Sequence, residues 1–358
     1  MSGAEEDRRE ALRQRLQALL EGPVNPRLRD ALLADLHGWQ AARIPAFGRL
    51  VARRGAGAAL PTDVFRHARV AAHPAAEDVR VFRTSGTTQG ARGEHALRTT
   101  SLYTQAALRW AETLLFPDAR PLRLVALLPT EVEAPDSSLA FMVARFGERF
   151  GTLTTVWRGG ALDVSGLAET LHDAGRRGDA VALLGTSFAF VHAEEELGEA
   201  RFALPPGSRL MQTGGFKGRS REVAPAPLRA ALTARYGLPE SHIVGEYGMT
   251  ELGSQAYEGT LADALAGRAP GPRRYRFPPW VRVSLSDPET LAPTDAAEGL
   301  LRVDDPVNLD SVAFVQTSDR ASLVEGEVVL HGRAPGARAR GCSLAVEEAL
   351  DALPEASP

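Results

Sequence analysis

Leucine residues recur at helical spacing near the start of the chain. They form two groups: Leu12, Leu16, Leu19 and Leu20, then Leu28, Leu32, Leu33 and Leu36. Residues three or four positions apart share one face of an α-helix, so each group marks a face that packs against a core. The spacing therefore predicts that the chain begins with two helices.

Farther along, short apolar runs alternate with helical patterns. The runs predict buried strands at 79–82, 122–129, 180–185 and 209–215. The patterns between and after them predict helices at 101–115, 136–149, 165–177, 187–198 and 224–236. Alternating strands and helices are typical of an α/β fold with mainly parallel sheets, in which ligands bind at the carboxyl ends of the strands.

The pattern changes near residue 275. Four short apolar segments broken by turn residues follow: "WVRVSLSD", "GLLRVDD", "VAFVQTSD" and "EVVLHG". They predict an antiparallel barrel or a small sheet. The stretch 265–279 is rich in Gly, Pro and Arg and is the clearest internal connection. One further helix is predicted at about 343–352.

Composition narrows the class of protein. The 358 residues suffice for two domains, or for one large domain with an appendage, and 44% of them are hydrophobic. The net charge of −4 gives no basic field that would attract nucleic acid. No apolar run is long enough to predict a membrane span, and the acidic, amphipathic start does not resemble a secretory signal. Because Cys342 is the only cysteine, an internal disulfide is excluded, and we expect a cytoplasmic protein.

The stretch "TSGTTQGARG" at 84–93 contains many short hydrogen-bond donors and little side-chain bulk. It follows one predicted strand and precedes the predicted helix at 101–115. Hydroxyls, glycines and an arginine in such a position could cradle phosphate oxygens, or form a plain surface turn. It is not a Walker A loop, because no G-K-[ST] follows at the required spacing.

A second polar stretch, "YGMTE", occupies 247–251 after a short apolar run. Tyr247 could stack on a base, Thr250 could bind phosphate, and Glu251 could bind Mg²⁺. The alternative is a turn with an ordinary solvated glutamate.

Together and in this order, the two stretches resemble the adenylate-forming superfamily of acyl-CoA synthetases, luciferases and peptide-synthetase adenylation domains. The resemblance covers about residues 75–348 and implies that ATP and Mg²⁺ are the cofactors. Thr250 and Glu251 would be catalytic, and Glu251 would also bind the metal. The family's motifs assign ATP binding to Thr84, Ser85, Gly86, Thr87, Thr88, Arg92, Tyr247, Gly248 and Met249.

Three weaker matches extend the resemblance. "QTGGFKG" resembles the family's adenine-side segment and points to Gly214 and Gly215. "QTSDR" resembles the segment whose aspartate binds the ribose, here Asp319, and "HGR" resembles the hinge motif, here ending in Arg333. The phosphate loop itself departs from the pattern, because Gln89 replaces a glycine and Arg92 replaces a lysine.

The resemblance also implies a division of the chain. Members of the family continue well beyond the hinge and carry an assisting lysine there, whereas the last lysine here is Lys217. We therefore expect an adenylate-forming domain at 1–332, with mixed α/β sheets and a small barrel-like subdomain. A severely truncated C-terminal segment would occupy 333–358.

The segment "RARGCSLAVEEAL" at 338–350 resembles the LuxE-like acyl-protein synthetases of bacterial fatty acid reductase systems. That branch implies a carboxylic acid substrate, with a fatty acid as one candidate, and acyl transfer to Cys342. From there the acyl group would pass to a reductase, a transferase or a carrier protein. From the residues alone, a loop-to-helix junction with Arg338 and Arg340 favours the thiolate, while early glutamates oppose it, so that any lowering of the cysteine pKa would be modest. The alternative is a small buried structural cysteine.

Two other functions remain open. One is an enzyme like phenylacetate-CoA ligase that acylates CoA or a carrier-protein thiol. The other is a scaffold that binds nucleotide or acyl-adenylate with reduced catalysis. His95 could contact phosphate or a carboxylate, although a structural role is the simpler interpretation. Asp304 and Asp305 are interpreted as a strand-ending turn rather than as a metal site.

Overall fold

The computed structural model describes residues 3–85, 91–214, 224–333 and 340–350. The chain divides into two compact units. The first unit comprises Met1–Ala106, Met249–Ser254 and Phe277–Pro358, and the second comprises Ala107–Gly248 and Gln255–Arg276. The boundary after Arg276 lies within the connection predicted at 265–279. The predicted division of the chain at residue 332 stays a prediction.

The second unit contains the predicted parallel sheet, in the strand order β5-β4-β8-β9-β10-β11-β12. The first five strands are parallel to one another, and β11 and β12 continue the sheet in antiparallel pairing. The bounds are β4 Leu122–Leu127, β5 Gly151–Thr155, β8 Val181–Thr186, β9 Arg209–Thr213, β10 Ile243–Tyr247, β11 Ala256–Glu258 and β12 Tyr275–Arg276.

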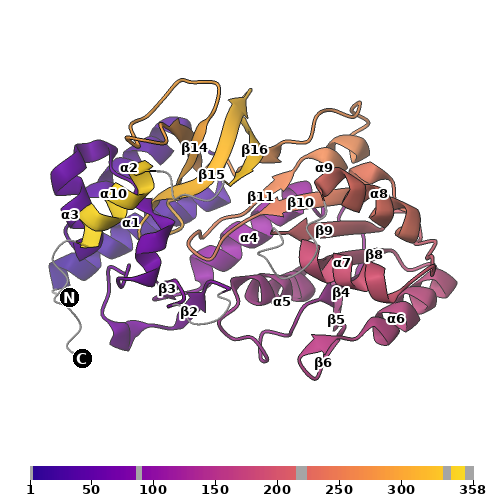
Figure 1. Cartoon of the computed structure of the whole chain (residues 1–358). Helices are drawn as coiled ribbons and strands as arrows, with labels where there is room; N and C mark the ends of the chain where they lie inside the picture. The colour runs from indigo at the N-terminus through magenta and orange to yellow at the C-terminus, as the bar shows by residue number, and fades with distance from the viewer. Residues whose placement is uncertain (1–2, 86–90, 215–223, 334–339, 351–358) are drawn as a thin grey trace. The chain divides into compact units, whose positions relative to one another are not determined.

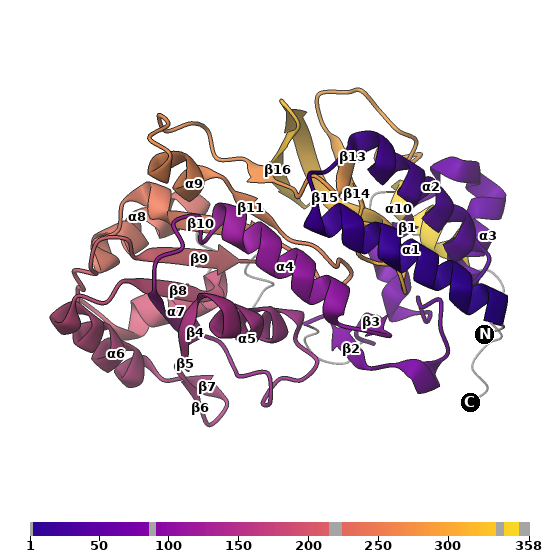
Figure 2. The same ribbon diagram turned by 180° about the vertical axis from the view of Figure 1, so that it is seen from behind.

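Helices cover both faces of this sheet. Leu167 of α6, Phe190 of α7 and Leu232 of α8 share one core with Val125 of β4, and Figure 1 shows these helices on that side. Helix α5 covers the opposite face (Figure 2), where its Gly147 lies against the side chain of Leu153 of β5. The helices and turns are α5 Ser138–Phe150, α6 Val164–Arg177, α7 Ser187–Glu196, α8 Pro225–Tyr236, α9 Thr260–Leu265 and η4 Glu240–His242. A small hairpin, β6 Trp157–Arg158 with β7 Ala161–Leu162, precedes α6.

The hydrophobic pattern locates most of these elements. The strands predicted at 122–129, 180–185 and 209–215 are β4, β8 and β9, and the helices predicted between 136 and 236 are α5 to α8. Strand β5, by contrast, was not predicted. Its sequence, "GTLTT", has little apolar character because four of its five residues are only partly buried and one is exposed. This is expected for an edge strand.

The first unit contains the antiparallel sheet predicted after residue 275. Its strands β13, β14, β15 and β16 pair in sequence order, and β1 pairs with β15 in parallel. A register shift lies in β14–β15 and another in β15–β16, so that the long strand β15 bends. The bounds are β1 Leu60–Pro61, β13 Arg282–Ser286, β14 Gly299–Asp304, β15 Phe314–Val324 and β16 Glu327–Arg333.

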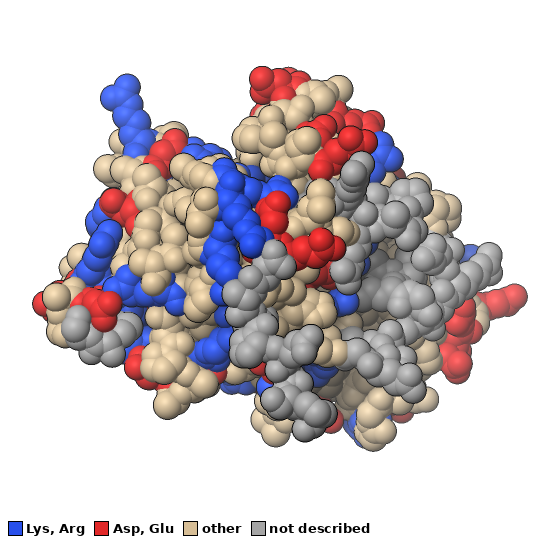
Figure 3. Space-filling view, turned by 60° about the vertical axis from the view of Figure 1, so that its left-hand side comes forward, with Lys and Arg blue, Asp and Glu red and all other residues tan. Residues whose placement is uncertain are grey.

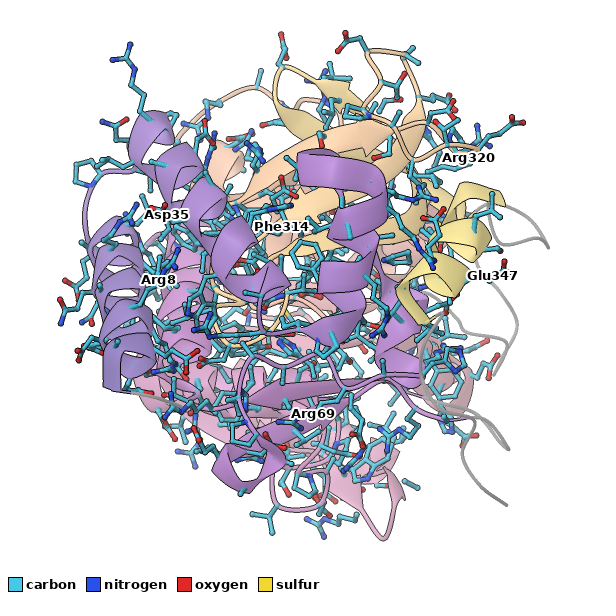
Figure 4. All side chains as sticks on the ribbon, turned by 90° about the vertical axis from the view of Figure 1, so that its left-hand side faces the viewer. Arg8, Asp35, Arg69, Phe314, Arg320 and Glu347 are labelled. Carbon is cyan, nitrogen blue, oxygen red and sulfur yellow. The ribbon has the colours of Figure 1, made fainter. Side chains whose placement is uncertain are left out.

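Helices from both ends of the chain pack together in the first unit. These are α1 Gly3–Glu21, α2 Pro26–Ala41, α3 Pro45–Arg54 and α10 Arg340–Leu350. The last helix packs against α3 and β1, as the yellow ribbon among the indigo helices of Figure 1 indicates. Phe314 fills the interior beneath the N-terminal helices (Figure 4) and stacks on Phe47 with 5.8 Å between ring centroids. The two predicted N-terminal helices are confirmed, and the leucines that predicted them, apart from the exposed Leu28, are buried.

One predicted strand belongs to a different sheet from the one expected. Residues 79–82 were expected in the parallel sheet, but β2 (Arg80–Arg83) pairs only with β3 (Glu94–Leu97) in a separate antiparallel hairpin. Strand β3 therefore lies between the segment 84–93 and α4 (Ser101–Leu114). The expected junction from loop to helix N-terminus is wrong, because a second strand returns before the helix begins. Three short turns complete the unit: η1 Gly55–Gly57, η2 Thr62–Arg66 and η3 Ala75–Glu77.

Charged side chains of both signs are interspersed on the face shown in Figure 3. Many of them form ion pairs, such as Arg15 with Asp35 at 2.6 Å. Within the described ranges, no helix combines the length and the apolar character needed to span a bilayer.

Candidate functional site

Two of the predicted nucleotide-binding positions lie at the carboxyl edge of the parallel sheet in the second unit. Gly214 directly follows β9, and Tyr247 ends the adjacent strand β10. Gly214 has a φ of 73°, a left-handed conformation that favours glycine. The Tyr247 ring lies 5.9 Å from that of Tyr275. This edge is where an α/β sheet binds its ligands.

A buried carboxylate adjoins Tyr247. Glu246 is 5% exposed, and burial raises the pKa of its carboxyl to about 7, although a hydrogen bond from Thr213 opposes the shift. Gly248 must be small here, because a Cβ at this position would lie 2.3 Å from Oε1 of Glu246. The side chain of Glu246, two residues earlier, therefore explains sterically why the "YGMTE" motif has a glycine at this position.

Glu246→Gln should stabilise the protein at about pH 8 but not at about pH 4, by up to about 3 kcal/mol. The folded carboxyl has the higher pKa, so the wild-type protein loses stability as pH rises from 4.5 to about 7. Glutamine does not titrate and avoids that loss. Urea unfolding at both pH values measures the difference, with Glu240→Gln, an exposed carboxylate, as the control. An equal effect of Glu246→Gln at both pH values would contradict the prediction.

The predicted phosphate loop is closed at its base by hydrogen bonds. The Thr84 backbone N–H donates to the Gly93 carbonyl, and the Gly93 N–H donates to the Thr84 hydroxyl oxygen, both at 2.9 Å. Arg92 adds a third hydrogen bond at this base, since its Nε donates to the Thr84 carbonyl oxygen at 2.6 Å. Ser85, the next residue after Thr84, is exposed. Gly86, Thr87, Thr88 and Gly215, which were also predicted to bind ATP, lie outside the described residues.

The remaining residues of "YGMTE" belong to the first unit and form a turn. The Leu252 N–H donates to the Met249 carbonyl oxygen at 3.1 Å, which places Thr250 and Glu251 in the middle of the turn. Glu251 is 7% exposed, so the alternative of an ordinary solvated glutamate is wrong.

His95 connects this turn to the hairpin of the phosphate loop. Its Nδ1 lies 2.7 Å from the Thr250 carbonyl oxygen, and its side chain is fully buried. A carbonyl oxygen only accepts hydrogen bonds, so Nδ1 carries the proton. Burial lowers the pKa of His95 to about 4, which keeps the ring neutral near pH 7.

The segment 305–308 holds the turn from another direction. Asn308 donates from Nδ2 to the Glu251 carbonyl oxygen at 2.8 Å. The buried carboxylate of Asp305 accepts from the backbone N–H groups of Gly253 at 3.0 Å and Ser254 at 2.7 Å. Asp304 instead pairs with Arg282 and Arg302. The two adjacent acids thus have different partners. Asp305 does more than end a strand, as the sequence suggested, because it also holds the backbone that follows Glu251.

Gly253→Ala should destabilise the protein by about 1–3 kcal/mol. A Cβ at this position would lie 2.6 Å from Cγ1 of Val307 and 3.0 Å from Oδ1 of Asn308, both in buried side chains. Thermal unfolding measures the loss. Gly57→Ala is the matched control, because a Cβ at Gly57 meets nothing within 4 Å. If Gly253→Ala unfolds at the same temperature as the wild type, the segment 305–308 must shift to accommodate the Cβ without cost, and the prediction is wrong.

The structure brings the two predicted ribose-side residues together. Asp319 of β15 and Arg333 of β16 are register partners, and Nε of Arg333 lies 3.3 Å from Oδ1 of Asp319. The arginine side chain is 73% exposed and the aspartate side chain 15% exposed. A carboxylate beside a solvent-facing guanidinium is compatible with hydroxyl recognition.

Cys342 lies on the buried face of α10. It shares that face with Ala345, Val346 and Ala349, which follow at helical spacing, and it is 3% exposed. Its Sγ lies 4.0 Å from the carbonyl oxygen of Thr317, in the same strand as Asp319. The helix is anchored to α3, where Arg49 donates to the Ala349 carbonyl oxygen at 2.7 Å.

The expectation that the surroundings of Cys342 favour a thiolate is wrong for this structure. Burial, together with the charge of Asp63, raises the pKa of the thiol to about 11. Helix α10 begins at Arg340, earlier than predicted, so Cys342 lies inside its first turn and faces the core. The desolvation of a buried thiol outweighs the partial charge of the helix N-terminus.

The residues present fit Mg²⁺ that is held mainly by a nucleotide. Among residues 3–85, 91–214, 224–333 and 340–350, no group of three or more His, Cys, Asp or Glu side chains forms a metal cage. Mg²⁺ commonly binds one or two carboxylates together with substrate phosphates, and Glu251 could supply such a carboxylate.

The sequence carries no signal for two of the residues that hold the turn. Asn308 is 57 positions from Glu251, and His95 is 155 positions from Thr250. Neither pair belongs to a common motif, and a structural role for His95 was the simpler interpretation.

No protein-family model matches the chain, and no curated protein matches it. Solved structures that it resembles include the luciferase-like enzyme of the nonluminescent mealworm Zophobas morio, at 14% identity and a TM-score of 0.50, covering 72% of this chain and 57% of that one. Another is 2-hydroxyisobutyryl-CoA ligase in complex with 2-HIB-AMP and CoA, at 14% identity and a TM-score of 0.56, covering 93% of this chain and 69% of that one. The chain thus spans little more than half the length of the first. These likenesses show that the chain has the fold of the adenylate-forming enzymes.

Proposed function

We propose that the protein activates a carboxylic acid with ATP. A carboxylate oxygen of the acid attacks the α-phosphorus, the bond to the β-phosphate oxygen breaks, and acyl-AMP and pyrophosphate form. One observation carries the proposal: His95, in the strand that closes the phosphate-loop hairpin, donates directly to Thr250 of "YGMTE". The strand that directly follows the first motif is thereby hydrogen-bonded to the second motif.

The roles follow from the chemistry of the side chains. The loop from Thr84 to Arg92 would bind the phosphates, Tyr247 the adenine and Asp319 the ribose. Glu251 would hold Mg²⁺, which when bound supplies positive charge against the phosphate oxygens. The solved ligase of the same fold contains an acyl-AMP analogue of this intermediate, 2-HIB-AMP, together with CoA.

A second step would pass the acyl group to a thiol. A thiolate attacks the acyl carbonyl carbon, AMP leaves, and a thioester forms. An external thiol, of CoA or of a carrier protein, is favoured by the burial of Cys342 and the raised pKa of its thiol. The LuxE-like alternative, acylation of Cys342 itself before transfer to a partner protein, is supported by the proximity of Sγ to Thr317. It requires α10 to move and expose the thiol.

Acid-dependent exchange of labelled pyrophosphate into ATP tests the first step. A panel of aliphatic, aromatic and hydroxy acids should include at least one that supports Mg²⁺-dependent exchange. If the protein binds ATP but exchanges no pyrophosphate with any acid, the proposed activity fails and a nucleotide-binding scaffold is the better description.

A further inference from the structure

The turn at Thr250–Glu251 has its two central carbonyl groups fixed by two different buried side chains. His95 donates to the carbonyl oxygen of Thr250 at 2.7 Å, and Asn308 donates to that of Glu251 at 2.8 Å. His95 comes from β3 and Asn308 from the segment between β14 and β15. All four residues belong to the first unit.

These two bonds fix the backbone on both sides of one α-carbon. The Thr250 carbonyl lies in the peptide plane that precedes the Glu251 α-carbon, and the Glu251 carbonyl lies in the plane that follows it. Holding both planes fixes φ and ψ of Glu251, and with them the direction of its Cα–Cβ bond. The direction in which the Glu251 carboxylate leaves the backbone is therefore set by His95 and Asn308.

Each of the two side chains is itself held in place. The His95 ring packs edge-on against Phe65, with 6.1 Å between ring centroids, and among the residues that the structure describes its buried Nε2 has no hydrogen-bond partner. Asn308 is 1% exposed and donates a second hydrogen bond, to the Val312 carbonyl oxygen at 3.0 Å. A buried polar group is costly to leave without a hydrogen bond, and the bond to Thr250 meets this need for Nδ1 of His95.

The exit of the turn is anchored as well. Besides the two backbone N–H groups, the hydroxyl of Ser254 donates to Oδ1 of Asp305 at 2.9 Å, and Trp280 donates from Nε1 to that hydroxyl at 3.0 Å. The turn therefore has little freedom to rotate as a whole.

We propose that His95 and Asn308 are positioning residues for acid activation, which act by orienting Glu251. This inference rests on the proposed function. A single carboxylate that must meet Mg²⁺ and phosphate oxygens gains most from a fixed direction, because a displacement of about 1 Å can lower the rate about 100-fold.

The test compares two replacements of His95 with a matched control. His95→Phe keeps a ring but removes the donor, whereas His95→Asn retains an N–H donor near the position of Nδ1. Ser311→Ala is the control, because it also removes one buried bond from a side chain to a carbonyl, that of Ser311 to Val70, without touching the turn. Pyrophosphate exchange gives kcat and the KM for MgATP, and thermal unfolding gives stability.

His95→Phe should lower kcat by about 10- to 100-fold with little change in KM. His95→Asn should recover most of that loss, and Ser311→Ala should keep the wild-type kcat while losing comparable stability. Wild-type kcat in His95→Phe, or an equal loss in Ser311→Ala, would overturn the proposal.

Amide hydrogen exchange of the unliganded protein separates this inference from the proposed function. Without its donor at position 95, the peptide covering 247–254 should exchange faster in His95→Phe than in Ser311→Ala. Equal protection in the two variants would overturn the positioning role even in an active enzyme. A wild-type protein inactive with every acid would instead overturn the proposed activity, while the exchange of this peptide would still decide whether His95 holds the turn.

Discussion

Glu251→Gln should lower acid-dependent ATP–pyrophosphate exchange by roughly 100- to 1,000-fold. Glutamine has nearly the same shape and should keep both carbonyl bonds of the turn, because His95 binds the backbone carbonyl of Thr250 and Asn308 binds that of residue 251. The neutral amide is a much weaker ligand for Mg²⁺ than a carboxylate. The loss therefore reports on charge at the metal and not on the fold of the turn.

The measurement is initial exchange rate as a function of Mg²⁺ concentration. Glu94→Gln serves as the control, because it removes one negative charge from the base of the phosphate loop, where Glu94 pairs with Arg83 at the surface. It should leave the rate within about twofold of wild type, as surface ion pairs contribute little. Wild-type exchange by Glu251→Gln would remove Glu251 from the metal-binding role.

Cys342→Ala should leave pyrophosphate exchange intact and abolish any covalent acyl label on the protein. Adenylation precedes the involvement of a thiol, so the first step does not need Cys342. If the enzyme acylates itself, ATP and a labelled acid should leave a label that neutral hydroxylamine releases, as expected of a thioester. Cys342 is the only cysteine in the chain, so no other thiol can carry that label.

A second measurement, the reactivity of the thiol, helps to distinguish Cys342 from an external thiol as the acyl acceptor. A thiol that is 3% exposed, with its pKa raised to about 11, should react slowly with a thiol reagent in the resting protein. Faster modification in the presence of ATP and acid would indicate that α10 releases the thiol during turnover. A label that survives in Cys342→Ala would show that the acyl group is not held by Cys342. No label at all, with rapid thioester formation on added CoA or carrier protein, would favour the external acceptor.

Much of the fold could be predicted from local pattern. The parallel strands β4, β8 and β9 are continuous apolar runs because both faces of their sheet are covered by helices. The helices between them show their buried face at helical spacing. Strand β2 was assigned to the wrong sheet because an apolar tetrapeptide does not encode its partner, and only the return of β3 decides the pairing.

The candidate site likewise has some features that local sequence predicts and others that it does not. The motif residues could be recognised before the fold was known, since the hydroxyls of 84–88 and the acid of "YGMTE" have the residue types and the spacing of the motifs. Asp319 and Arg333 were likewise identified from their motifs, and the antiparallel pairing of β15 with β16 explains why two residues 14 apart meet.

The contacts that hold these residues in place, and their exposure to water, could be read only from the folded chain. The bonds of His95 and Asn308 to the turn join segments distant in sequence, and no local pattern encodes such contacts. The same holds for Cys342, whose neighbours along the chain favoured a thiolate. Its pKa is instead set by the loss of water when α10 packs on α3 and β1, and desolvation depends on which surfaces meet in the folded chain.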